Sequence, residues 1–245
     1  MQIKKLILKI VRSFLNKIGY DILKYKTTYP SEIVNDLLKR YRISLILDVG
    51  ANTGQYSKEL RKAGFKGRIT SFEPLADAYY SLKAVANKDR NWNAYQYALG
   101  DQSGKTVLHV SKHSPSSSLL PMTDLHTEAA PGSEYYREEE IEIRTLDEVF
   151  NSLGVSGERI FMKIDCQGYE EKVLKGAQLS FPSIIGLQIE LSAVALYQGE
   201  EAYYSICEFV EENHFQLVRI IPGYSSKTTG EMLQFDAIFF RTNLV

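Results

Sequence analysis

The chain has 245 residues, of which 44% are hydrophobic, and its 29 basic side chains are balanced by 30 acidic ones. This size and composition predict one substantial hydrophobic core, whereas the near-zero net charge excludes the basic field of a general nucleic-acid-binding protein. Only two cysteines occur, without the spacing of a zinc site or a disulfide framework, which favours a reducing, cytoplasmic compartment.

The first predicted element is a basic amphipathic helix within residues 1–30, an appendage to a single domain over residues 31–245. Residues 1–26 hold seven lysines and arginines and only one acid. Apolar residues recur at helical spacing over residues 3–18, and lysines take the opposite face. Such a stripe is buried either on an anionic membrane surface or against protein, including a second copy of the chain; we favour packing against protein. The apolar runs are too short for a membrane span and too often interrupted by lysine for a signal peptide.

A second helical pattern covers residues 31–41 and leads into the stretch that organises the chain, residues 46–57, I-L-D-V-G-A-N-T-G-Q-Y-S. A short apolar run meets Asp48, Gly50 and Gly54 interrupt the pattern, and helical spacing resumes after the second glycine. This order predicts a strand, a tight loop and the start of a helix. Glycine lets a ligand lie directly on the backbone, and the amide groups of a helix start suit a carboxylate or a phosphate.

An acid follows the next predicted strand, residues 68–72. Glu73 lies about 20 residues beyond the glycines, where a neighbouring parallel strand would present it to ribose hydroxyls. The loop matches neither the G-x-G-x-x-G of dinucleotide-binding folds nor the P-loop, which disfavours a nucleotide phosphate. These features together predict half of an adenosine-binding fold; the alternative is a plain glycine turn between a strand and a helix.

The remaining sequence continues the alternation of strands and helices. Residues 104–144 form a strand–loop–strand insertion whose middle lacks periodicity, which indicates a functional lid or disorder. Strands are predicted over residues 93–99, 105–111, 140–144, 159–164, 184–191, 215–220 and 233–241, and helices over residues 76–86, 145–153 and 202–213.

Two stretches carry a family resemblance: D-V-G-A-N-T-G with the later F-E-P, and M-K-I-D-C-Q-G-Y-E-E-K-V-L-K-G-A at residues 162–177. Over residues 44–241 the chain resembles the FkbM-type family of class I S-adenosylmethionine (SAM)-dependent methyltransferases. The resemblance implies a Rossmann-like α/β fold, with a mostly parallel seven-stranded sheet, an antiparallel last strand and helices on both faces. It also implies SAM as the cofactor and favours a lid in the insertion. One departure is Gln167, where many members carry glutamate, which argues against a charged role at that position.

The resemblance and the loop pattern together nominate the SAM-binding residues. Asp48 and the loop backbone would hold the methionine part and Glu73 the ribose. In the family, an acid in the loop after the third strand accepts a hydrogen bond from the adenine amino group, and Asp101 matches it; a simple Asx turn is the alternative. The full expected set is Asp48, Gly50, Asn52, Thr53, Gly54, Tyr56, Glu73 and Asp101.

Asp165 and Glu190 also end predicted strands, so they share this rim of the sheet and remain for the methyl acceptor. Asp165 is the first candidate for the general base, followed by Glu190 and His126. The alternative for the two acids is the capping of strand-to-helix loops. They could also hold a divalent metal, but no third ligand can be named, so no metal is predicted.

We therefore expect SAM-dependent O-methylation of a hydroxyl on a sugar, glycan or secondary metabolite, with a small molecule or a glycan as acceptor. The alternatives are an NAD-dependent oxidoreductase and a non-catalytic interaction module with a SAM fold. The predicted location is cytoplasmic, while peripheral membrane contact through residues 3–18 and a homo-oligomer both stay open.

Overall fold

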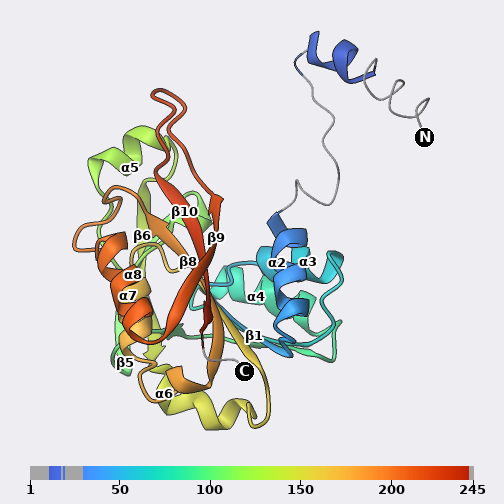
Figure 1. Cartoon of the computed structure of the whole chain (residues 1–245). Coiled ribbons are helices and arrows are strands. Elements are labelled where there is room, and N and C mark those ends of the chain that lie inside the picture. The colour runs from blue at the N-terminus through green and yellow to red at the C-terminus, as the bar shows by residue number, and fades with distance from the viewer. Residues whose placement is uncertain (1–10, 18, 20–29, 243–245) are drawn as a thin grey trace.

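The computed structural model describes residues 11–17, 19 and 30–242 (Figure 1). Residues 11–17 are helical, and Phe14 among them is 65% exposed. The rest of the predicted amphipathic helix, including most of its apolar stripe, lies outside the described residues. Within the described part of the chain, no helix has the length and apolar character needed to cross a membrane.

Seven strands form the central sheet: β1 (Leu45–Val49), β2 (Arg68–Phe72), β3 (Trp92–Tyr95), β7 (Ile160–Ile164), β8 (Ile184–Ser192), β9 (Phe215–Pro222) and β10 (Gln234–Arg241). Their order in the sheet is β3-β2-β1-β7-β8-β10-β9. β1 pairs in parallel with β2 and β7, whereas β10 pairs antiparallel with β8 and β9. This arrangement confirms the predicted fold class.

Helices cover both faces of this sheet (Figure 1). One face carries α2 (Pro30–Arg40), α3 (Gln55–Lys62) and α4 (Ala76–Ala86), and the other carries α6 (Leu146–Val149), α7 (Glu170–Lys175) and α8 (Tyr203–Glu212). Ile46 of β1 packs into the apolar cluster of the first face, and Leu45 and Leu47 pack into that of the second. Because β1 is buried on both sides, its sequence is a nearly continuous apolar run.

A second, three-stranded sheet carries the insertion. Its antiparallel strands β5 (Gly104–Ser111) and β6 (Tyr135–Arg144) flank a 3-10 turn, η2 (Ser114–Ser116), and the helix α5 (Asp124–Ala129). The Thr123 N–H, just before α5, donates to the Leu196 carbonyl at 2.9 Å. The aperiodic middle of the insertion is thus docked on the loop that follows β8.

The prediction of one continuous third strand over residues 93–99 is wrong. β3 ends in the central sheet, and β4 (Ala98–Leu99) pairs in parallel with β6 in the second sheet. Between them, Tyr97 is buried against Phe72 and beneath the guanidinium of Arg144. β3 and β4 each bury apolar residues in a separate core. The apolar pattern of the sequence therefore continues across the break between the two strands and gives no sign of it.

Candidate active site

A cavity of about 540 Å³ lies where β1, β2, β7 and β8 end. Its volume falls within the range of small-molecule binding sites. The strand ends contribute the acids Asp48, Glu73, Asp165 and Glu190 to its wall, as expected for ligand sites in open α/β sheets. The insertion adds Ser114, Pro115, Ser117 and Leu119, and the start of α2 adds Pro30, Ser31 and Val34.

The loop between β1 and α3 passes very close to the loop between β7 and α7. A Cβ at Gly50 would lie 1.9 Å from the Asp165 carbonyl oxygen, and the φ of Gly50 is +77°. Glycine is required here, since a side chain would clash and L residues rarely adopt this φ. The Gly50 and Ala51 amides donate to the Phe72 carbonyl at 3.1 and 3.0 Å, which holds the loop against β2.

Glu73 lines the cavity at the end of β2. Its carboxylate accepts the backbone N–H groups of Asn52 and Leu75, each at 2.8 Å, and only 5% of the residue is exposed. Burial raises the pKa of Glu73 to about 7, against the opposing effect of these two hydrogen bonds. A carboxylate has about four lone-pair sites, so Glu73 retains acceptor capacity for hydroxyl donors in the cavity.

Asp48 lies beneath the glycine loop and is held by two serines. Its Oδ2 accepts the hydroxyls of Ser57 at 2.6 Å and Ser71 at 3.1 Å. Burial raises the pKa of Asp48, and the two hydroxyls counteract that rise. Since Ser57 belongs to α3 and Ser71 to β2, Asp48 fixes both elements around the loop.

The other predicted SAM residues of the loop fall into two groups. Asn52 and Tyr56 line the cavity, and Asn52 Nδ2 also donates to Ser114 Oγ of the insertion at 2.8 Å. Thr53 and Gly54 do not line it. Gly54 instead precedes α3 with a φ of +79°, so its contribution is to turn the chain into the helix.

Asp101 does not line the cavity. It follows β4 of the second sheet, and its Oδ2 pairs with Lys172 Nζ at 3.3 Å. The expectation that Asp101 sits at the rim of the central sheet assumed an unbroken third strand. The structure therefore does not bring Asp101 together with the other predicted SAM residues.

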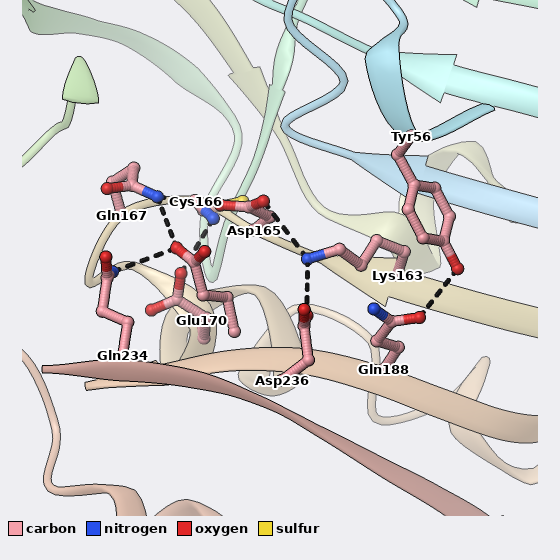
Figure 2. A network of polar contacts seen from close by, with 10 residues as sticks. Tyr56, Lys163, Asp165, Cys166, Gln167, Glu170, Gln188, Gln234 and Asp236 are labelled. Atoms are coloured by element: carbon pink, nitrogen blue, oxygen red, sulfur yellow. Dashed lines mark hydrogen bonds and ion pairs between the residues drawn. The ribbon is translucent and has the colours of Figure 1, made fainter. Parts of the chain in front are cut away.

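An ion cluster lines the cavity where side chains of β7 and β10 meet across the intervening strand β8 (Figure 2). Lys163 Nζ lies 3.2 Å from Asp165 Oδ2 and 3.1 Å from Asp236 Oδ1, with 5% of the lysine side chain exposed. Burial alone would lower the pKa of Lys163, but the two carboxylates raise it well above its usual range. Burial would likewise raise the pKa of Asp165, but Lys163 and hydrogen-bond donors hold it below its usual range. The Asp165 carboxylate is consequently ionised.

Gln167 joins Asp165 to Glu190, the second acid of this wall. Its Nε2 donates to Asp165 Oδ1 at 2.8 Å and to Glu190 Oε2 at 2.5 Å, and Gln234 Nε2 donates to the same Glu190 oxygen at 3.0 Å. The pKa of Glu190 is well above its usual range, first because the group is buried and second because the Asp165 charge is close. The directions of the two pKa shifts place the charge of the pair on Asp165 and its proton on Glu190.

Residues 48–217 match the family described as "Methyltransferase FkbM domain". The chain belongs to the FkbM methyltransferase family. A comparison with curated proteins gives no match. Similar solved structures include a SAM-dependent methyltransferase from Aquifex aeolicus, with 14% identity, a TM-score of 0.43, and coverage of 93% of this chain and 97% of that one. Another is the magnesium protoporphyrin IX methyltransferase ChlM from Synechocystis PCC 6803 with bound SAM, with 11% identity, a TM-score of 0.44 and 96% coverage of each chain.

As an FkbM-family methyltransferase, the chain uses SAM as its cofactor, which removes the NAD-dependent alternative. The cavity fits this group. Gly50 and Ala51 present backbone without long side chains, and the Glu73 carboxylate has free lone pairs for a ribose diol. Gly50, Asn52 and Glu73 are therefore the residues that would hold SAM.

The third candidate base of the methyltransferase, His126, lies in α5 outside the cavity wall. Its buried ring meets Tyr197 edge-on, with centroids 5.1 Å apart, and its Nδ1 has no hydrogen-bond partner among the described residues. Burial lowers the pKa of His126, which keeps the imidazole neutral. The structure thus does not bring His126 together with Asp165 and Glu190.

Sequence reasoning missed four polar residues of this site: Lys163, Gln188, Gln234 and Asp236. Gln188 accepts the Tyr56 hydroxyl at 2.8 Å, and the other three form the contacts described above. A signal was present, since each lies inside an otherwise apolar predicted strand, where a polar side chain is unusual. Among the described residues, no group of three or more His, Cys, Asp or Glu side chains is placed to hold a metal ion.

Proposed function

We propose that this FkbM-family methyltransferase methylates a hydroxyl of a sugar, glycan or secondary metabolite. The observation that carries the proposal is the Asp165 carboxylate in the cavity wall, kept ionised by Lys163 and by the amide of Gln167. An ionised carboxylate in this position can take the proton that an acceptor hydroxyl loses on methylation. Asp165 is accordingly the proposed general base.

The protein has two tasks in such a reaction. SAM, when bound, supplies a methyl group on a sulfonium that is its own leaving group, so the acceptor oxygen must be aligned and its proton removed. Alignment of two reactants contributes on the order of 7 kcal/mol or more. Proton removal by a positioned base adds roughly a hundredfold in rate. The cavity wall around Asp165 and Gln188 would orient the acceptor, and Asp165 would take its proton.

The polar character of this wall supports a polyhydroxyl acceptor. The carboxyl groups of Asp165 and Glu190 and the amide of Gln188 all line the cavity and offer both donors and acceptors. Adjacent hydroxyls of a sugar can add hydrogen bonds to these groups, whereas a flat apolar acceptor can form none with them. A glycan or a sugar nucleotide is therefore favoured over a small aromatic compound.

The test is transfer of a labelled methyl group from SAM to sugar nucleotides, lipid-linked glycans and phenols. Label on a sugar hydroxyl supports the proposal, together with loss of roughly a hundredfold or more in kcat for Asp165→Asn at unchanged SAM affinity. Label only on a phenol or a nitrogen contradicts the acceptor class, and a wild-type rate for Asp165→Asn contradicts the base. SAM binding without transfer to any acceptor or cell extract would favour a non-catalytic module.

Although packing against protein is favoured for residues 3–18, we propose as its testable alternative a peripheral contact with the cytoplasmic face of a membrane, beside a membrane-attached acceptor. The alternation of apolar residues and lysines supports this placement, because such a helix buries its stripe at the interface while its cations meet anionic lipid. Packing against the domain or a second copy of the chain is the competing outcome.

A further inference from the structure

Gln167 contacts both acids of the acceptor wall. It is a non-glycine residue with a positive φ, +54°, directly after Asp165 and Cys166. Its Oε1 accepts the hydroxyl of Tyr197 at 2.7 Å, and Tyr197 is fully buried. Because this bond fixes the oxygen end of the amide, the NH₂ end faces Asp165 and Glu190.

The hydrogen bonds of Glu190 indicate which of its oxygens carries a proton. Oε2 accepts two amide N–H groups, one from Gln167 and one from Gln234, and so acts as an acceptor. Gln167 Nε2 bridges Asp165 Oδ1 and Glu190 Oε2, so the two carboxyl groups lie close together. Two carboxyl groups in such contact hold one proton between them, since two adjacent charges repel. Because Oε2 already accepts two amide N–H groups, the proton of the pair belongs on Oε1 of Glu190.

We propose that Gln167 is a positioning residue that makes Asp165 and Glu190 a pair sharing one proton, with the charge held on Asp165. Its two N–H groups fix one oxygen of each acid, and Lys163 pairs with the other oxygen of Asp165, which leaves Oε1 of Glu190 to carry the proton. The use of this pair in catalysis rests on the proposed O-methylation, but the pair itself is a property of the free protein.

Other ionisable groups surround the pair on every side. Lys163 of β7 contacts Asp165, and Asp236 of β10 pairs with Lys163 and lies opposite Glu190 in the sheet. Asp48 of β1 interacts with Asp165, and Glu170 of α7 and Tyr197 lie beyond. Only Lys163 among them is a cation, and it contacts Asp165 rather than Glu190. The charge of the pair is consequently stabilised on Asp165.

A glutamate at position 167 would not serve this purpose. It would remove both N–H donors and place a third carboxyl group between two others, so that a second proton or a cation would be needed. A methionine would remove the donors without adding a charge. The two substitutions therefore change the protonation of the Asp165–Glu190 pair in different ways, while the length of the side chain at position 167 stays nearly the same.

The experiment is a pH titration of the full chain, with carbon-13 in Asp and Glu carboxyl groups followed by NMR. In the wild type, Asp165 should remain ionised at pH values below those at which an ordinary aspartate takes up its proton. Glu190 should remain protonated at pH values above those at which an ordinary glutamate releases its proton. Gln167→Met should bring the titration midpoints of the two acids closer together, and Gln167→Glu should raise the titration midpoint of Asp165. Gln55→Glu is the matched control, because Gln55 lines the same cavity but is exposed and bonds only to Asn52 in its loop.

Two results would overturn the proposal: both carboxyl groups ionised in the neutral wild type, or titrations in both Gln167 variants that equal those of the wild type and of Gln55→Glu. If Gln167→Met does not fold, Tyr197→Phe provides the second variant, since it frees the amide to rotate without removing it. SAM affinity, measured by calorimetry, should stay within about threefold, because Gln167 lies at the acceptor wall. No acceptor is needed for these measurements, so failure of the proposed function leaves their outcome unaffected.

Discussion

Gly50 and Asp165 lie in van der Waals contact across two loops, so close that a Cβ on Gly50 would be 1.9 Å from the Asp165 carbonyl oxygen. Gly50→Ala should therefore displace both the SAM loop and the loop that carries the proposed base. We expect SAM affinity to fall more than tenfold and the protein to lose about 2 kcal/mol or more of stability. Calorimetry with SAM and urea unfolding measure the two effects.

The control for this substitution is Gly157→Ala. Gly157 has nearly the same φ, +78°, but a Cβ there meets no atom within 4 Å. Gly157→Ala should show only the cost of placing alanine in the left-handed backbone conformation, about 1 kcal/mol, and unchanged SAM affinity. Equal losses in the two variants would mean that backbone conformation, rather than the contact with Asp165, makes Gly50 necessary.

Glu73→Ala tests the ribose contact. Hydrogen bonds to a charged group contribute about 1.5 to 3 kcal/mol, so SAM binding should weaken roughly tenfold to a hundredfold. Glu142→Ala serves as control, since Glu142 is an exposed residue of β6 that pairs with Arg144 outside the cavity. Unchanged SAM affinity in a folded Glu73→Ala protein would place the ribose elsewhere.

The raised pKa of Glu73 predicts a pH dependence of stability. The folded protein holds this proton up to about pH 7, whereas the unfolded chain releases it near the ordinary value of 4.5. Between these two values the folded state binds more protons, so stability falls as pH rises, by about 3 kcal/mol from this group. Urea unfolding at about pH 5 and pH 8 should show a smaller difference for Glu73→Gln than for the wild type. Equal differences would contradict the assignment.

Lys163→Met removes the cation between Asp165 and Asp236. Breaking a buried ion pair on one side typically costs about 3 to 5 kcal/mol, because the carboxylates keep their burial and lose their partner. Adding Asp236→Asn should recover part of this loss. Lys105→Met, which breaks the exposed pair with Glu140, should have no measurable effect. A Lys163→Met protein as stable as the wild type would show that the cluster is not electrostatically coupled.

The proposed membrane contact of residues 3–18 predicts a salt-dependent association. The full chain should sediment with anionic liposomes at low salt and be released at about 0.5 M salt, because screening weakens the lysine contacts. Removal of residues 1–20 should abolish sedimentation and leave SAM binding intact. Unfolding or a changed oligomeric state in the truncated protein would instead assign the helix to packing against protein.

Local sequence signals were sufficient to place the strand–loop–helix–strand unit that carries Asp48, Gly50 and Glu73. β2 and α4 have the predicted bounds, and Asp48, Gly50 and Glu73 meet at the cavity as expected. These residues lie within about one strand–helix–strand unit, so chain geometry alone brings them together.

The acceptor half depended on long-range pairing that the sequence does not display. Lys163 and Asp236 are 73 residues apart and meet only because β10 inserts beside β8. The position predicted for Asp101 fails for a different reason. It was inferred from one continuous third strand, whereas the chain leaves the central sheet after Tyr95 and enters the second sheet as β4. Periodicity reports burial, and a strand is equally buried in either sheet.

The position of β10 between β8 and β9 has a consequence for folding. β9 precedes β10 in the chain but can join the sheet only after β10 has paired with β8, so an incompletely folded chain carries an unpaired strand that includes Leu217 and Ile220. Such strands are open to wrong pairing with other chains. Until β10 has paired, Lys163 also lacks Asp236, so the methyl-acceptor wall is completed only when the last strand of the chain has joined the sheet.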